Sequence, residues 1–274
     1  MSYPVAMIPY TNMAPYRQLG EPAGCHFVPC VPSESVRALK TGEVLAAAVP
    51  VGGLKALEGL VENLGPFGIA ARERSMSVLL FSDRPFSEMR TPATVWLTGD
   101  SESSVRLLFL LLGYRHGFDH LPRATRNPEQ ANAELVIGDA ALKRVLVDCR
   151  PAAGPLFHCG PDHTFVTDLA AEWFALKGRP FVFARWVIRQ DAPAGVKKAM
   201  TAWLDIFGGR EGELVRDCIP AAATRLKVSS RVIDAYFKVI RRRLTDDDMA
   251  GQALFLTELA QYARQPLFRP AAET

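Results

Sequence analysis

Short apolar segments alternate with helical segments over the first third of the chain. Segments 5–8, 44–49 and 77–82 are mostly apolar, which is typical of strands that are buried on both faces of a sheet. Segments 32–40 and 54–60 carry helical spacing and lie between these strands. The five segments predict a first β-α-β-α-β unit.

The alternation continues as far as residue 188. Segment 94–97 predicts a strand, which small polar residues connect to an apolar helix over 105–112. Segment 134–142 repeats this order of strand, small turn and helix start. A helix over 169–176 then precedes a long strand over 181–188, which could cross between two lobes.

From residue 192 onward the pattern is mainly helical. The predicted helices span 196–207, 211–218, 229–242 and 246–262. Thr245 and Asp248 have the spacing of a capping box, and the acidic residues 246–248 suit the positive end of the last helix. The whole pattern predicts an α/β fold with mainly parallel sheets and flanking helices.

Polar residues follow three of the predicted strands. Asn12 comes after the first strand, residues 101–104 after the strand over 94–97, and Asp139 after the apolar segment that ends at Gly138. Parallel sheets bind ligands at the carboxyl ends of their strands, and small polar residues at a helix start favour an anion. The sequence therefore predicts a cleft for a small anionic ligand.

Each of these polar residues also has a structural interpretation. Asn12 could be a turn residue, the serines of segment 101–104 could cap the following helix, and Asp139 could cap the helix that starts at Ala140. The Ser77 hydroxyl, at the head of a buried strand, needs a hydrogen-bond partner from the backbone or from a ligand. The common location of these residues favours a binding site.

Composition and charge exclude several classes of partner. A hydrophobic fraction of 49% and a charged fraction of 22% are those of a folded globular protein. The formal net charge of +3 is small and dispersed, so we expect no nucleic-acid partner. The longest apolar run, residues 107–112, is far shorter than the roughly 20 residues of a membrane-spanning helix, so we expect no membrane partner.

The cysteines and the first residues of the chain predict a cytoplasmic location. The 5 cysteines are odd in number and irregularly spaced, as expected of reduced thiols. Residues 1–15 lack the basic start, the apolar stretch and the small-residue cleavage site of a secretory signal.

The chain carries none of the standard cofactor motifs. No G-x-G-x-x-G, G-x-x-x-x-G-K-[ST], G-x-S-x-G or H-E-x-x-H pattern occurs in the sequence. Cys25-His26 with Cys30, and His158-Cys159 with His163, have only a loose metal-like spacing that matches no zinc pattern. We therefore expect no cofactor and no metal.

Several segments together resemble the chorismate dehydratase family of the futalosine route to menaquinone. The resemblance is carried, in order, by residues 9–12, 31–34, 77–82, 101–105, 136–142, 168–169, 172–173, 178–184 and Trp186. The sister naphthoate synthase family would have Cys-Pro-Asn-Asp near its start, where this chain has Pro9-Tyr10-Thr11-Asn12.

The resemblance implies a two-lobed, type II periplasmic-binding-protein-like fold with a cleft between the lobes. Lobe 1 is expected over residues 1–90 and 188–274, and lobe 2 over residues 91–187. The implied activity is that of a carbon-oxygen lyase, which eliminates water from chorismate to give 3-[(1-carboxyvinyl)oxy]benzoate. The resemblance leaves open whether the chain forms a homodimer. The alternative is a non-catalytic binding protein of the same fold for a small aromatic or carboxylate ligand.

The resemblance also implies roles for particular residues. Asn12 and Ser77 are the expected catalytic residues, through hydrogen bonds to the leaving hydroxyl or to a carboxylate. The expected substrate-binding residues are Tyr10, Thr11, Ser101, Ser103, Ser104, Asp139 and Arg185. Because these motifs contain no His, the enolpyruvyl carboxylate of the substrate is the expected base.

Four positions depart from what the resemblance predicts. The family would have an Asp near Leu45, a Ser-Ser pair near Pro50-Val51, and a small or apolar residue at Arg185. Arg185 could pair with a substrate carboxylate or lie on the solvent side of its strand. These departures predict a partly remodelled pocket.

Overall fold

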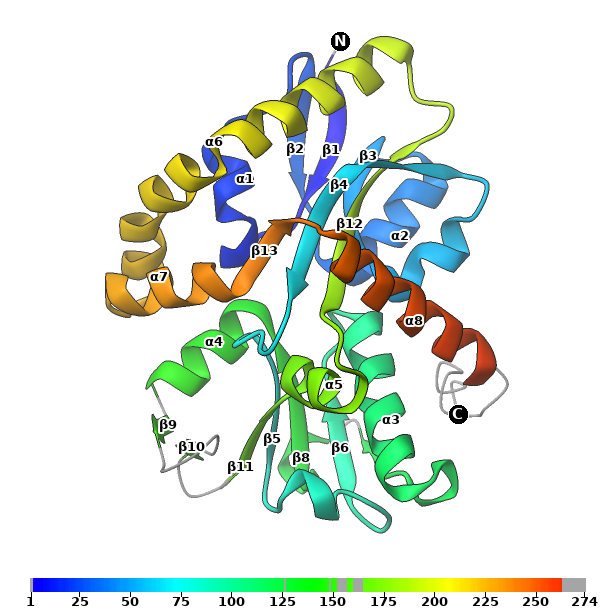
Figure 1. Cartoon of the computed structure of the whole chain (residues 1–274), viewed down its shortest axis with the longest axis vertical. Helices are drawn as coiled ribbons and strands as arrows, with labels where there is room; N and C mark the ends of the chain where they lie inside the picture. The colour runs from blue at the N-terminus through cyan, green and yellow to red at the C-terminus, as the bar shows by residue number, and fades with distance from the viewer. Residues whose placement is uncertain (1, 126, 148, 152–156, 160–164, 263–274) are drawn as a thin grey trace.

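Two α/β lobes, each built on one sheet, make up the protein (Figure 1). The computed structural model describes residues 2–125, 127–147, 149–151, 157–159 and 165–262. The sheet of lobe 1 contains β1 (Tyr3–Met7), β2 (Cys25–Pro29), β3 (Ala46–Pro50), β4 (Val61–Ala71), β12 (Phe181–Arg189) and β13 (Ile240–Arg243), in the order β13-β4-β12-β3-β1-β2. The sheet of lobe 2 contains β5 (Val78–Ser82), β6 (Thr94–Leu97), β7 (Arg123–Thr125), β8 (Ala133–Ile137) and β11 (Phe165–Asp168), in the order β11-β5-β8-β6-β7.

Helices cover both faces of the lobe 1 sheet. Its helices are α1 (Ala14–Gln18), α2 (Pro32–Thr41), α6 (Ala194–Leu226) and α7 (Ser230–Val239), with the 3₁₀ helices η1 (Thr11–Met13) and η2 (Val51–Leu57). On one face Tyr16, Trp203 and Phe207 pack around Trp186 of β12. On the other face Leu39 and Leu57 join a second buried cluster. Burial of these side chains fixes the layers of lobe 1.

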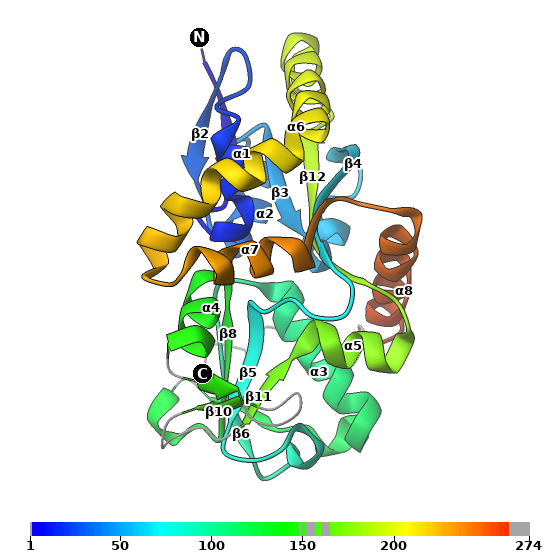
Figure 2. The same ribbon diagram turned by 60° about the vertical axis from the view of Figure 1, so that its left-hand side comes forward.

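Lobe 2 carries α3 (Glu102–His116), α4 (Gly138–Val147) and α5 (Leu169–Lys177). The remaining elements are η3 (Phe86–Glu88), η4 (Phe118–His120), η5 (Pro128–Gln130) and the antiparallel pair β9 (Cys149–Pro151) and β10 (Phe157–Cys159). The last helix, α8 (Asp246–Tyr262), brings Phe255 against Trp173 of α5 and Phe181 of β12, so it packs on the core of lobe 2. Figure 2 shows α8 beside α5 and α7 above α4.

Both sheets are mixed, whereas the sequence predicted mainly parallel sheets. β1 is parallel to β2 and β3, and β6 is parallel to β7 and β8. β12 is antiparallel to β3 and β4, and β5 is antiparallel to β8 and β11. The reason is the path of the chain: β5 and β12 are each reached from the opposite lobe, so each starts at the cleft and runs away from it.

The assignment of these two crossing strands to lobes was wrong in the sequence-based prediction. β5 belongs to the sheet of lobe 2 and β12 to the sheet of lobe 1. Residues 54–60 are not an independent helix, because η2 covers Val51–Leu57 and β4 follows at Val61. Residues 196–218 belong to the single helix α6, and residues 229–242 divide between α7 and β13.

β4 has no clear strand pattern in the sequence because Gly65, Pro66 and Gly68 interrupt it. Gly68 is required by close packing, since a Cβ atom there would lie 2.2 Å from the carbonyl oxygen of Ala184 on β12. By contrast, α8 begins where its capping box predicts. The Thr245 N–H donates to Asp248 Oδ2 (2.8 Å), and the Asp248 N–H donates to Thr245 Oγ1 (3.3 Å).

Candidate active site

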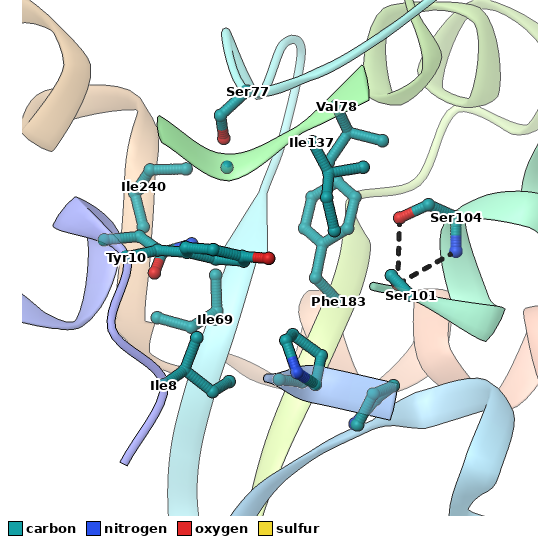
Figure 3. A pocket seen from close by; sticks show the side chains of 15 residues that line it. Ile8, Tyr10, Ile69, Ser77, Val78, Ser101, Ser104, Ile137, Phe183 and Ile240 are labelled. Carbon is teal, nitrogen blue, oxygen red and sulfur yellow. Dashed lines mark hydrogen bonds between the residues drawn. The ribbon is translucent and has the colours of Figure 1, made fainter. Parts of the chain in front are cut away.

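A pocket lies between the two lobes, and residues of both lobes line it. Five polar residues line it, namely Tyr10, Asn12, Ser77, Ser101 and Ser104. The other lining residues are mainly apolar and include Ile69, Ile137 and Phe183. In Figure 3, Tyr10 and Ser77 lie at one end of the pocket and Ser101 and Ser104 at the other, with the Phe183 ring between them.

The ends of strands from both lobes place these residues. β1 runs into the segment that carries Tyr10 and Asn12, and β6 runs into the turn that carries Ser101. β8 ends at Ile137, which lines the pocket together with Gly138. The carboxyl ends of these three strands therefore meet at the cleft, which supports the location inferred from the sequence.

Ser101 and Ser104 form the serine end of the pocket, at the start of α3. Ser101 is the N-cap residue, and its Oγ accepts hydrogen bonds from the Ser104 N–H (3.3 Å) and from the Ser104 hydroxyl (3.1 Å). Both serines are buried. The capping interpretation is thus correct for Ser101, and the same residue also presents the positive end of a helix dipole to the pocket.

Asn12 and Ser77 form the opposite end, and a residue that the sequence did not indicate supports them. The Tyr236 hydroxyl of α7 donates to Ser77 Oγ (3.0 Å), and burial raises the pKa of Tyr236 well above its ordinary value. Asn12 Oδ1 is buried and has no hydrogen-bond partner among the described residues. Tyr236 lies on the same helix face as Ile233 and Phe237, so its spacing indicates only a core residue.

Thr11 and Asp139 connect the two lobes beside the pocket. Asp139 Oδ1 accepts a hydrogen bond from the Thr11 N–H (2.7 Å), and Asp139 Oδ2 lies 2.7 Å from Arg225 Nη1. The second terminal nitrogen of the Arg225 guanidinium, Nη2, donates to Thr11 Oγ1 (2.6 Å). We call Thr11, Asp139 and Arg225 the latch. Its bonds hold Asp139 of lobe 2 against η1 and α6 of lobe 1.

Further contacts between the lobes involve Tyr10 and Ser103. The Tyr10 hydroxyl donates to Asp100 Oδ2 (2.9 Å), and burial, followed by this carboxylate, raises the pKa of Tyr10. Ser103 Oγ accepts a hydrogen bond from the Gly52 N–H (2.7 Å). Tyr10 therefore lines the pocket and bridges the lobes, whereas Ser103 only bridges them.

Arg185 lies outside this pocket, between β12 and α8. Its side chain is buried, with the residue 3% exposed, and its guanidinium donates to the Gly65 carbonyl (3.1 Å), to Gln252 Oε1 (3.3 Å) and to the Met249 sulfur. Burial lowers the pKa of Arg185. The alternative of a solvent-side position is also wrong, because α8 covers this side of β12 and brings Met249 and Gln252 onto the guanidinium.

The other departures from the family pattern have different positions. Pro50 lines the pocket, and Val51 is fully buried in the core of lobe 2. Leu45 is only partly buried and packs against the core of lobe 1. The apolar Pro50 at the end of β3 is thus the departure that contributes directly to the pocket wall.

No charged side chain lines the pocket within the part of the chain that the structure describes. Over the same residues, no group of three or more His, Cys, Asp or Glu side chains could hold a metal ion. His163, one of the residues with loose metal-like spacing, lies outside the described residues. Among the helices described, none is both long and apolar enough to cross a membrane.

Comparison with known proteins gives a family match over nearly the whole chain. The model of a menaquinone biosynthesis family matches residues 3–261. The chorismate dehydratase of Thermus thermophilus is 30% identical over 275 residues, which cover 98% of this chain and 98% of that protein.

Solved structures with low sequence identity share the fold. A protein from Archaeoglobus fulgidus matches with a TM-score of 0.69 and 12% identity, over 96% of this chain and 98% of its own. The alkanesulfonate-binding protein of Xanthomonas axonopodis pv. citri matches with a TM-score of 0.63 and 12% identity, over 98% and 94%. A Candida albicans protein with the generic periplasmic binding protein fold matches with a TM-score of 0.60 and 12% identity, over 98% and 93%. The chain therefore has the two-lobed binding-protein fold.

Proposed function

This chain belongs to the menaquinone biosynthesis family, and on that premise we propose that it is a chorismate dehydratase. The proposed reaction is the elimination of water from chorismate to give 3-[(1-carboxyvinyl)oxy]benzoate, which is the work of a carbon-oxygen lyase. The family match and the identity to the Thermus thermophilus enzyme extend over almost the entire chain.

The observation that carries the proposal is the division of the pocket into two polar ends and an apolar middle. Phe183 and Ile137 supply walls that suit the faces of a six-membered ring. The start of α3 offers the hydroxyl proton of Ser101 to a carboxylate, because the N–H and the hydroxyl of Ser104 both donate to Ser101 Oγ. At the other end, Asn12 Oδ1 has no partner among the described residues and Ser77 lies close by, so both are available to a hydroxyl of the ligand.

The reaction needs little chemistry from the protein. Two bonds break: the C–H bond on the ring carbon that bears the enolpyruvyl ether, and the C–O bond between the ring and its hydroxyl. The electron pair of the C–H bond becomes the double bond that makes the ring aromatic. The enolpyruvyl carboxylate of the substrate takes the ring proton and delivers it to the departing hydroxyl, which leaves as water. The balance requires no oxidant and no outside acid. Positioning is then the main contribution of the protein.

The side chains at the site support the substrate carboxylate as the base. The residues that line the pocket include no Asp, Glu or His in the described part of the chain. The nearby Asp139 carboxylate is already held by the Thr11 N–H and by Arg225. In this proposal the Ser77 hydroxyl donates to the leaving oxygen and stabilises the charge that develops on it, whereas Asn12 Oδ1 accepts the proton of the substrate hydroxyl and orients that hydroxyl before it leaves.

Incubation of the purified protein with chorismate tests the proposal. We expect the diene absorbance to decay and an aromatic product, lighter by one water, to appear in the mass spectrum. Ser77→Ala should abolish most of this turnover. Ser82→Ala is the matched control, because Ser82 is also buried at β5 but its hydroxyl donates to the Arg84 carbonyl (2.7 Å).

The same measurement separates the enzyme from a binding protein of the same fold. Saturable binding of chorismate without turnover would contradict the dehydratase and favour the non-catalytic alternative. The cytoplasmic location stays a prediction of the sequence, and the sequence leaves open whether the chain forms a homodimer.

A further inference from the structure

Tyr236 reaches the polar end of the pocket from a distant part of the chain. The residue is fully buried, and its hydroxyl lies 3.0 Å from Ser77 Oγ, although the two residues are 159 positions apart. Its helix, α7, lies at the boundary between the lobes in both ribbon views (Figures 1 and 2). Tyr236 therefore fastens lobe 1 to the first residue of the lobe 2 pocket wall.

The hydrogen bond from Tyr236 restricts what the Ser77 hydroxyl can do. A serine hydroxyl has one proton to donate and two lone pairs that accept. Tyr236 occupies a lone pair of Ser77, so the Ser77 proton must point elsewhere. Among the described residues it donates to the Ser75 carbonyl at 3.4 Å, which is long for an O–H donor. A ligand oxygen at ordinary hydrogen-bond distance would be the better acceptor.

The surroundings of Tyr236 keep its phenol in the donor form. Burial is the largest influence and raises the pKa of Tyr236, which therefore remains protonated at any working pH. Its role is therefore to donate a hydrogen bond rather than to transfer a proton. Six residues further on, the Arg242 guanidinium donates from Nε to the Asn12 carbonyl (3.0 Å). Tyr236 and Arg242 thus hold both Ser77 and Asn12 from behind.

We propose that Tyr236 is a positioning residue, which orients the Ser77 hydroxyl so that it donates to the leaving hydroxyl of the substrate. The inference rests on the proposed dehydratase activity. It differs from a general packing role because it acts mainly through one hydrogen bond, from the Tyr236 hydroxyl to Ser77 Oγ (3.0 Å), beside a weaker interaction with the Asn12 side chain.

Tyr236→Phe and Tyr16→Phe are the matched pair of variants that test it. Both tyrosines are fully buried, but the Tyr16 hydroxyl donates to the backbone carbonyls of Arg242 (3.1 Å) and Gly68 (3.3 Å) instead of to a pocket residue. We expect Tyr236→Phe to lower kcat about tenfold, the effect of one lost hydrogen bond, with KM nearly unchanged. Tyr16→Phe should leave kcat within about twofold of the wild type, since its effect is on folding.

A double-mutant cycle gives the sharper result. In the Ser77→Ala background, Tyr236→Phe should lower kcat much less than in the wild type, because the atom through which it mainly acts is gone. An equal loss in both backgrounds would overturn the inference, as would a kcat for Tyr236→Phe that matches Tyr16→Phe. The wild-type rate tests the proposed function separately. An inactive wild type would contradict both the dehydratase activity and the role of Tyr236, whereas an active wild type with no effect of Tyr236→Phe would contradict the role of Tyr236 alone.

A second variant covers the case in which Tyr236→Phe fails to fold. A polyfluorinated tyrosine at position 236 keeps the ring and the hydroxyl but ionises at lower pH. We expect kcat of this variant to fall with rising pH while kcat of the wild type stays level, because the ionised phenol no longer donates. Superimposable pH profiles would overturn the inference.

Discussion

Two groups of polar side chains meet at the cleft, and they differ in where their hydrogen bonds go. The latch residues Thr11, Asp139 and Arg225 satisfy one another across the lobes. Asn12, next to Thr11, leaves Oδ1 buried without a partner in the described structure. Neighbouring residues of one short segment therefore serve different purposes, because one closes the cleft and the other faces the ligand.

Burial separates the two groups further. The Arg225 side chain is 46% exposed, and an ion pair that is this open to solvent contributes only about 0–1 kcal/mol to closure. Asn12 Oδ1 is buried without a partner among the described residues, and an unmet hydrogen-bonding group in such a place costs on the order of 1–3 kcal/mol. The latch can thus open readily, whereas the Asn12 end of the pocket keeps an unpaired hydrogen-bond acceptor that a ligand would satisfy.

Removal of the pocket groups should have the largest effect on turnover. We expect Asn12→Ala and Ser77→Ala each to lower kcat/KM by about 10²- to 10³-fold, as when a preorganised hydrogen-bonding group of an active site is lost. Steady-state kinetics with chorismate measure this effect, and thermal unfolding checks the fold. Ser82→Ala should retain nearly full activity. Equal losses of kcat/KM for the Ser77 and Ser82 variants would show that a serine of the pocket matters no more than a buried serine outside it.

Gly138→Ala should destabilise the fold at the point where the latch meets the pocket, because Gly138 lines the pocket and precedes Asp139 of the latch. Gly138 has φ +63°, and a Cβ atom there would lie 2.8 Å from the Tyr10 ring. Gly178, at φ +64°, has open space around the same position and is the matched control. Both changes should cost about 1 kcal/mol of backbone strain, and Gly138→Ala should cost about 1–3 kcal/mol more through the clash. Urea unfolding measures the free energy of unfolding of both variants. Identical curves for Gly138→Ala and Gly178→Ala would show that the Tyr10 ring moves aside at no measurable cost.

Loss of the latch should affect substrate binding more than chemistry. Asp139→Asn removes the charge that faces Arg225, and we expect KM to rise by up to about fivefold with kcat nearly unchanged, because at most about 1 kcal/mol of closure energy is lost. Asp191→Asn, which breaks the exposed pair with Arg189, should change neither constant. An Asp139→Asn variant that binds chorismate but is inactive would make Asp139 the base and contradict the substrate-carboxylate mechanism.

The smallest effect should come from Tyr10→Phe, which keeps the ring on Gly138 and removes the bond to Asp100. Burial and Asp100 raise the pKa of Tyr10, so the folded state keeps a proton that the unfolded chain loses above about pH 10. This term makes wild-type stability fall as the pH rises above 10, by at most about 1.4 kcal/mol per pH unit and less for a half-buried ring. Denaturation at pH 9 to 11 should show a shallower decline for Tyr10→Phe, and parallel declines would refute it.

The sequence by itself determined the elements whose signals are local. α8 starts at its capping box, and α2 begins at Pro32 and ends before Gly42, which adopts φ +75°. The same is true of the strand ends that place Asn12 and Ser101 at one cleft. In each case the information lies within a few residues, so it can be read without the rest of the chain.

Only the tertiary structure decided the partners. β13 carries Arg242 as a buried strand residue, which the sequence suggested would be helical, and its strand identity comes from pairing with β4. Likewise, Tyr236 meets Ser77 and Arg225 meets Thr11 only because the chain crosses twice between the lobes before α6 and α7 return to the cleft. Hydrogen bonds between residues 159 and 214 positions apart depend on that path, which no local pattern encodes.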